Sequence, residues 1–290
     1  MVKTTLLMGL MTGLMLLIGD YVGGGSGMMF MLVLSLVSNV LVYWYSDKFV
    51  ISQYGAQEVN AVQAPQLYGI VQELARRAGL PMPRVYVIDT ALPNAFATGR
   101  NPEHSAVCVT TGLMEMLEPR EIAGVLGHEM SHIKHNDILI STIAAGMAGI
   151  ISVLARFAFW FGGSRDRDNR SNPIAGLLIL ILTPLAAAII QLAISRTREY
   201  MADYSGGELS GDPDALADAL GKIDNIARRR TLPHATEATA HMFIVTPFSA
   251  QEAKAIFSTH PATEERIARL RKEAEDMRAK GTINPLIPNP

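Results

Sequence analysis

One stretch of five residues carries side chains that could hold a metal ion. His128 and His132 are four residues apart, and Glu129 directly follows the first histidine. Residues four apart share one face of a helix, so both imidazoles can reach the same ion. Glu129 would stand beside that ion, where it can take a proton from a water molecule. Zinc suits this arrangement, because it accepts nitrogen and oxygen ligands and leaves one position open for water.

Two histidines leave a zinc site incomplete, and a later carboxylate can complete it. The metzincin pattern would place a third histidine where this chain has Ile138. Glu199 and Asp203 are four residues apart and would share a helical face. Glu199 could bind the ion, and Asp203 could accept the far N–H of a ligating histidine and fix its tautomer. Taken alone, such a pair is usually a solvated helix face, so its position relative to the histidines decides its role.

The elements that position these side chains include four strongly apolar segments. Hydrophobic residues make up 49% of the 290-residue chain and charged residues only 18%. Because about 20 mostly apolar residues cross a bilayer, the sequence predicts about four transmembrane helices. They would cover residues 4–19, 21–46, 138–155 and 174–195. A cleaved signal peptide is the alternative for the first segment, and a buried helical pair is the alternative for the last two.

A hairpin of the third and fourth segments would bring the two motifs together. His132 precedes the third segment by six residues, and Glu199 follows the fourth by four, which places both about 6–9 Å outside the apolar region. A hairpin of buried helices would have the same effect. If all four segments cross, the two polar parts lie on one side, and the basic residues near the segment ends predict that this side is the cytoplasm.

The polar parts have the patterning of a globular domain. Apolar periodicity and a stop at Gly79 predict a helix over 65–78, and short β-branched runs predict strands at 84–88 and 105–110. The segment 92–99 reads as a turn leading into an edge strand. Further helices are expected to begin at Pro119, at Pro213 and just after Pro261. The predicted fold class is therefore mainly α-helical, with a small β-sheet.

Net charge and cysteine content exclude two other classes. A formal net charge of -2 gives no reason to expect a nucleic-acid partner, which would favour a basic surface. A single cysteine, Cys108, excludes a disulfide framework and a cysteine-rich zinc site.

Taken together, these motifs resemble the HtpX family of bacterial membrane zinc proteases, which are related to the CAAX prenyl endopeptidases. The resemblance includes 128–132, 195–203 and 94–99, the segment 258–261 with 265–267, and the order of the four apolar segments. It implies an α+β zincin-like protease domain, one Zn²⁺ per chain, and a multi-pass position in the bacterial inner membrane with the active site facing the cytoplasm. The implied partners are the lipid bilayer and polypeptide substrates, damaged or misfolded membrane proteins in particular.

The resemblance also assigns roles by residue. His128, His132 and Glu199 match the zinc ligands, Glu129 the catalytic base, and Asp203 the residue that orients a ligand. His260 is a candidate donor to the oxyanion, although a cap before Pro261 is the alternative. The edge strand would bind an extended substrate through its backbone. Its candidate substrate-binding residues are Asn94, Ala95, Phe96 and Ala97.

The expected organisation alternates membrane and catalytic parts. The N-terminal transmembrane hairpin covers 1–46, and the second hairpin covers 138–195. The catalytic parts are 47–137, with the zinc-binding helix, and 196–290, with the third ligand. Two other functions stay open: a prenyl-protein-type processing peptidase, which should have more spans, and a metal or proton transporter, which should carry ionisable residues within its spans.

Overall fold

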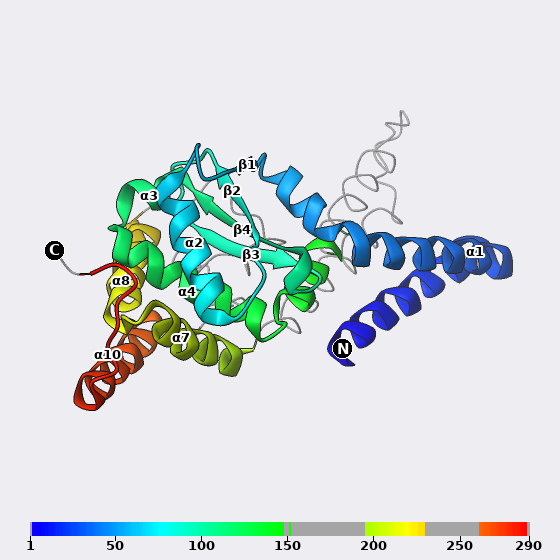
Figure 1. Cartoon of the computed structure of the whole chain (residues 1–290). Coiled ribbons are helices and arrows are strands. Elements are labelled where there is room, and N and C mark those ends of the chain that lie inside the picture. Colours follow the sequence, from blue (N-terminus) through cyan, green and yellow to red (C-terminus); the bar gives the residue numbers. More distant parts are fainter. Residues whose placement is uncertain (1, 148–150, 152–194, 230–260, 289–290) are drawn as a thin grey trace.

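The computed structural model describes residues 2–147, 151, 195–229 and 261–288, shown as coloured ribbon in Figure 1. A small sheet and its covering helices form one body, and a long N-terminal helical hairpin projects away from it. This arrangement is mainly helical with a small mixed sheet, as predicted.

The sheet has four strands in the order β1-β2-β4-β3. The strands are β1 (Gln57–Val59), β2 (Arg84–Ile88), β3 (Ala95–Gly99) and β4 (Ser105–Thr110). β2 runs parallel to β4, and β3 runs antiparallel to β4, with Ala97 opposite Val107. β3 is therefore an edge strand, as the sequence predicted, and the short helix η1 (Pro102–His104) joins it to β4.

Helices cover the sheet and form most of the core. They are α2 (Pro65–Ala78), α3 (Thr111–Met116), α4 (Pro119–Lys134), α7 (Arg196–Ser210), α8 (Pro213–Arg229) and α10 (Thr263–Lys280). Proline occupies the first position of α2, α4 and α8, where its missing N–H has no helical partner to lose. At the start of α4, Glu118 and Glu121 each accept the backbone N–H of the other, which forms a capping box.

Two glycines let α4 and α7 approach closely. A Cβ on Gly127 would lie 2.7 Å from the carbonyl oxygen of Gly206, and a Cβ on Gly206 would lie 2.6 Å from the amide nitrogen of His128. Both distances are too short for any side chain, so backbone packs on backbone here. The contact brings the first histidine of α4 directly over α7.

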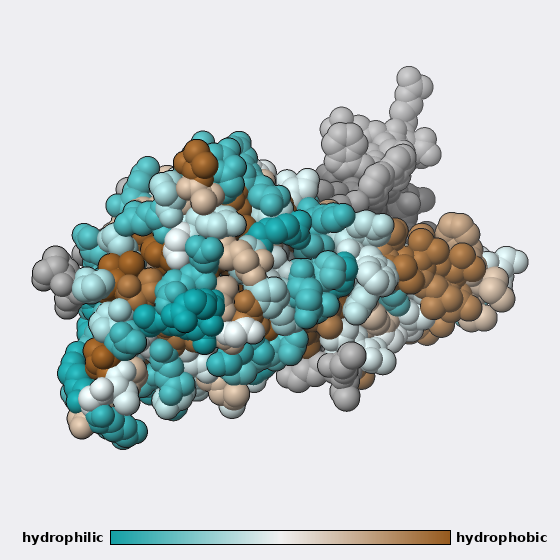
Figure 2. All heavy atoms as spheres, viewed as in Figure 1, coloured by the Kyte–Doolittle hydropathy of each residue, from teal (hydrophilic) through white to brown (hydrophobic). Residues whose placement is uncertain are grey.

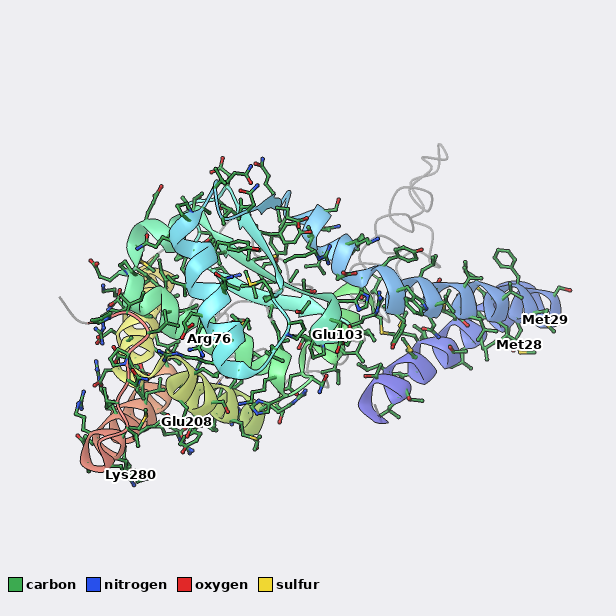
Figure 3. The ribbon with its side chains drawn as sticks, viewed as in Figure 1. Met28, Met29, Arg76, Glu103, Glu208 and Lys280 are labelled. Carbon is green, nitrogen blue, oxygen red and sulfur yellow. The ribbon has the colours of Figure 1, made fainter. Side chains whose placement is uncertain are left out.

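The projecting hairpin is α1 (Val2–Gln53), which bends at Gly23 and Gly24. Two of its stretches, Thr4–Tyr21 and Gly23–Gln53, are long and apolar enough to cross a membrane. Hydrophobic residues gather over the projecting end in Figure 2, and Figure 3 places Met28 and Met29 at its tip. The second arm continues as a helix seven residues beyond Ser46, the predicted end of its apolar segment.

The second predicted hairpin is only partly described. A short apolar helix, Ile138–Met147, begins where the third apolar segment was expected. Its buried side chains pack against Leu7, Met11 and Val42 of α1. The rest of that segment and nearly all of the fourth lie outside the described residues, so two of the four predicted spans have a described helix of sufficient length.

Candidate metal centre

The two predicted motifs meet between α4 and α7. The Nε2 atoms of His128 and His132 lie 3.3 Å apart, one helical turn from each other on α4. The carboxylate of Glu199, in the first turn of α7, lies 3.8 Å from the Nε2 of His128 and 3.7 Å from that of His132. One possible ligand atom from each of the three residues lies within 4.8 Å of the other two.

This group fits a zinc ion. With zinc–nitrogen distances of about 2.0–2.1 Å, two ligands of a tetrahedral ion stand about 3.3 Å apart, which is the separation of the two imidazole nitrogens. Two nitrogens that face each other this closely need a shared cation or proton between them. Two imidazoles and one carboxylate are also the ligand set of several catalytic zinc sites, with the fourth position left for water.

A buried ion pair, formed by Asp203 and Arg266, lies next to His128. The Nδ1 of His128 lies 2.9 Å from Oδ1 of Asp203, one turn after Glu199 on α7. Asp203 in turn accepts two hydrogen bonds from Arg266 of α10, at 2.8 and 2.7 Å. Arg266 is only 1% exposed. The Asp203 carboxylate thus lies against the imidazole of His128, and the guanidinium of Arg266 holds that carboxylate through two hydrogen bonds.

The charge of Asp203 follows from this pairing. Burial raises the pKa of a carboxyl group, but the charge and hydrogen bonds of Arg266, together with His128, lower the pKa of Asp203 well below its usual range. The same pairing raises the pKa of Arg266. Both groups are ionised at every physiological pH, so the contact on His128 is permanent.

His132 has its own acidic partner. Its Nδ1 lies 3.6 Å from Oδ2 of Asp137, in the turn after α4, and Asp137 accepts a 2.9 Å hydrogen bond from Arg198. Burial lowers the pKa of His132, but Asp137, Glu199 and Glu129 outweigh it and raise the pKa to about 9. The surroundings of this imidazole thus favour a positive charge, and a bound dication would supply it.

Glu129 connects the metal-ligand group to the edge strand. Its Oε2 accepts a 2.9 Å hydrogen bond from the backbone N–H of Ala97, in the middle of β3. The side chain is buried at 6% exposure. The carboxylate therefore bonds the strand predicted to bind substrate, and its charge acts on His132.

Hydrogen bonds fix β3 at both ends. At its start, the N–H of Asn94 donates to Oγ1 of Thr110, and the carbonyl of Asn94 accepts from the Thr110 amide. At its end, the N–H of Gly99 donates to Oγ1 of Thr142, which also contacts the hydroxyl of Thr98. Phe96 packs against the ring of Tyr54. The predicted segment 94–97 is thus bonded to Thr110 at Asn94 and to Glu129 at Ala97.

One predicted site residue is not described, and the site includes residues that the sequence did not indicate. His260 lies outside the described residues. His135 caps the end of α4, is exposed, and points no donor into the metal-ligand group. Arg266, Asp137 and Thr142 were missed as functional residues. Arg266 stood within a segment that matched the family, but only the folded chain shows which carboxylate it pairs with.

Comparison with known proteins agrees with this site. The model of peptidase family M48 matches residues 61–274. Two proteins described as "Protease HtpX homolog" are each 56% identical to this chain: one from Ralstonia pickettii over 278 residues and one from Paraburkholderia phytofirmans over 276. Both alignments cover 94% of this chain and 96% of the relative.

A solved structure shares the fold. The crystal structure of S. mikatae Ste24p matches with a TM-score of 0.51 at 22% identity, over 90% of this chain. This chain spans 62% of that longer protein. Because the family model covers most of the sequence and the HtpX relatives match nearly all of it, the chain belongs to peptidase family M48, among the HtpX-type zinc metalloproteases.

Proposed function

We propose that this chain is an endopeptidase in which His128, His132 and Glu199 bind the zinc ion and Glu129 is the general base. The observation that carries these roles is the position of Glu129, which borders the metal-ligand group on one side and bonds the edge strand on the other. A peptide paired with β3 would present its carbonyl beside that carboxylate. When bound, zinc supplies a Lewis acid for the carbonyl and for water.

The remaining steps belong to the side chains. Glu129 takes the proton of the attacking water and delivers it to the leaving amine. Asp203 and Arg266 keep the His128 imidazole in one tautomer and orientation throughout. As donor to the oxyanion we propose His260, on sequence grounds. The segment 94–97, which runs from Asn94 into β3, would pair with the substrate backbone.

The substrate we propose is an extended segment of a damaged or misfolded membrane protein. Backbone pairing with β3 supplies affinity without selecting a side chain, which suits a protease of broad specificity. The apolar arms of α1 join the catalytic body within the same chain. An enzyme held at the bilayer in this way meets membrane proteins more often than soluble ones. We place it in the bacterial inner membrane, with the active site on the cytoplasmic side.

Degradation of an unfolded model protein by the full chain in detergent tests the proposal. Cleavage is expected to stop with a chelator, to return with zinc, and to fall about 100-fold or more in Glu129→Gln. Lys272→Gln, an exposed change on α10, is the matched control and should cleave like the wild type. Equal cleavage by Glu129→Gln, with zinc content unchanged, would contradict the assignment of the base.

A further inference from the structure

A second, separate pocket lies where α1 meets the sheet. It encloses about 470 Å³ between the end of the second arm of α1 and the segment that leads from β3 to β4. Trp44, Tyr45 and Lys48 of α1 form one wall, and Arg84 and Arg100 form the other. Figure 3 labels Glu103 near this junction, well away from the α7 residue Glu208. The zinc ligands and Glu129 do not line the pocket.

Two of the cations in this pocket are held by aromatic rings. Arg100 lies over the ring of Trp44 at 4.6 Å, and Lys48 lies over the ring of Tyr45 at 5.3 Å. Within the described part of the chain, neither cation has a carboxylate within ion-pair distance. An aromatic face attracts a cation without occupying its N–H donors. Both side chains therefore keep donors available for an anion.

The charge balance of the lining is positive. Arg84 donates to Asp47 at 3.1 Å and to the hydroxyl of Tyr86 at 3.2 Å, so this cation and this carboxylate neutralise each other. The remaining charged groups of the lining are the cations Lys48 and Arg100 and one carboxylate, that of Glu103, which is exposed. One net positive charge with several N–H donors suits a singly charged phosphodiester.

The pocket lies at the depth of lipid headgroups if α1 crosses a bilayer. Lys48 is 20 residues after Met28, at the tip of the hairpin, which corresponds to about 30 Å of helix. The hydrocarbon core of a bilayer is also about 30 Å thick. Trp44 and Tyr45 would lie in the interfacial region, which is where such residues gather in membrane proteins.

An adjoining apolar pocket distinguishes a lipid from a soluble phosphate. About 150 Å³ is enclosed by side chains that include Leu41, Val42, Phe49 and Tyr45, and Tyr45 also lines the charged pocket. Tyr45 thus borders both the cationic pocket and a groove suited to an acyl chain. A soluble phosphate would use only the first.

We propose that these two pockets bind one anionic phospholipid, with its phosphodiester between Lys48 and Arg100 and an acyl chain along Leu41 and Phe49. Arg100 directly follows Gly99, the last residue of β3. The bound headgroup therefore fixes the end of the edge strand at a set height above the bilayer. The proposal concerns lipid binding and holds whether or not the metal centre is active.

Quenching of Trp44 fluorescence by brominated lipids in mixed micelles tests this site. The chain has two tryptophans, so the full-length protein with Trp160→Phe reports on Trp44 alone. We expect brominated phosphatidylglycerol to quench at a much lower mole fraction than brominated phosphatidylcholine. Each cation near an anionic headgroup favours binding about fivefold, so Lys48→Gln/Arg100→Gln should lose about 25-fold of that preference.

The controls separate this site from general electrostatic attraction. Lys272→Gln/Lys280→Gln removes two exposed cations from α10, at the far side of the body in Figure 3, and should keep the full preference. Lys48→Gln alone, at a side chain that contacts a ring and makes no hydrogen bond to the described residues, should lose about fivefold and serves if the double variant does not fold. Equal quenching by the two lipids in the parent protein would overturn the proposal. So would loss of the preference in millimolar inorganic phosphate, which would assign the pocket to a soluble anion.

Discussion

The helix α4 and the second arm of α1 are both rich in apolar residues, yet they use them in opposite ways. In α4, Leu126 and Met130 are fully buried against neighbouring helices. In α1, Leu36 and Phe30 are 54% and 68% exposed, and only 11% of the most apolar window of that arm is buried. The apolar surface of α4 is covered by the chain itself, whereas that of α1 is exposed and suits an apolar environment such as a lipid bilayer.

The polar groups of the two regions differ in the same sense. The helical body buries charged side chains in matched pairs, of which Arg266 with Asp203 is the most enclosed. The second arm of α1 carries no charged residue before Asp47 and Lys48, at the end that meets the sheet. Charged side chains therefore lie where water or a partner can compensate them, and the metal-ligand group lies in the helical body, which supplies such partners.

The largest expected effect is the loss of the metal ligand that joins the two helices of the site. Glu199→Gln removes one anionic ligand without changing the size of the side chain. Because bound zinc contributes several kcal/mol to the transition state, cleavage should fall about 1000-fold. Proteolysis of an unfolded substrate and zinc content per chain measure it. Full zinc content with wild-type cleavage would show that the third ligand is another residue.

Next in size is the removal of a partner from the buried ion pair. Arg266→Gln leaves the Asp203 carboxylate buried without its cation, which should lower the free energy of unfolding by about 3–5 kcal/mol. Arg269→Gln is the matched control three residues along α10, because its pair with Glu265 is exposed and should matter by less than about 1 kcal/mol. Denaturation of the full chain in detergent compares them. Similar losses in both variants would show that burial does not determine how much the ion pair contributes to the free energy of unfolding.

The contrast between the two apolar regions can be measured with one type of substitution. Leu126→Ala should cost about 2–5 kcal/mol of unfolding free energy, because it opens a cavity in the core. Leu36→Ala removes the same atoms from an exposed position on α1 and should change the unfolding of the catalytic body by less than about 0.5 kcal/mol. Equal costs would show that the α1 arm packs against protein and not against lipid.

The sequence predicted the parts of the fold that depend on local signals. Proline at the first position and glycine after the last one marked α2 from Pro65 to Ala78, and β-branched runs marked β2 and β4 at their observed ends. The spacing of His128 and His132 is likewise local, because four residues along any helix share a face. Glu199 was found because an acidic pair followed the fourth apolar segment at the right distance.

What the sequence did not reveal depends on contacts between distant segments. Asp203 was expected to orient a histidine, but its pairing with Arg266 joins residues 63 positions apart and has no local signal. Thr142 bonds the end of β3 from a helix that the sequence predicted only as apolar. The close approach of Gly127 and Gly206 could not be read from either glycine alone, since it requires the packing of α4 on α7.

One buried acid in the helical body has no ion-pair partner among the described residues. Glu273 of α10 is 8% exposed, and in the described structure its Oε1 has no hydrogen bond. Burial, together with the charges of Glu208 and Asp203, raises the pKa of Glu273 to about 8. Between its usual value and about 8, the folded chain holds a proton here that the unfolded chain has lost. Raising the pH through that range should therefore lower the free energy of unfolding.

Glu273→Gln removes the ionisable group and keeps its shape, so the variant should be more stable than the wild type at pH 8, by about 4 kcal/mol. The two proteins should differ little near pH 5, where the wild-type carboxyl is protonated in the folded state. Denaturation in detergent at both pH values measures the difference. If Glu273→Gln were less stable at pH 8, the carboxylate would be ionised and bonded in the folded state. Glu273 would then be one more buried charge of this body that is held by a partner.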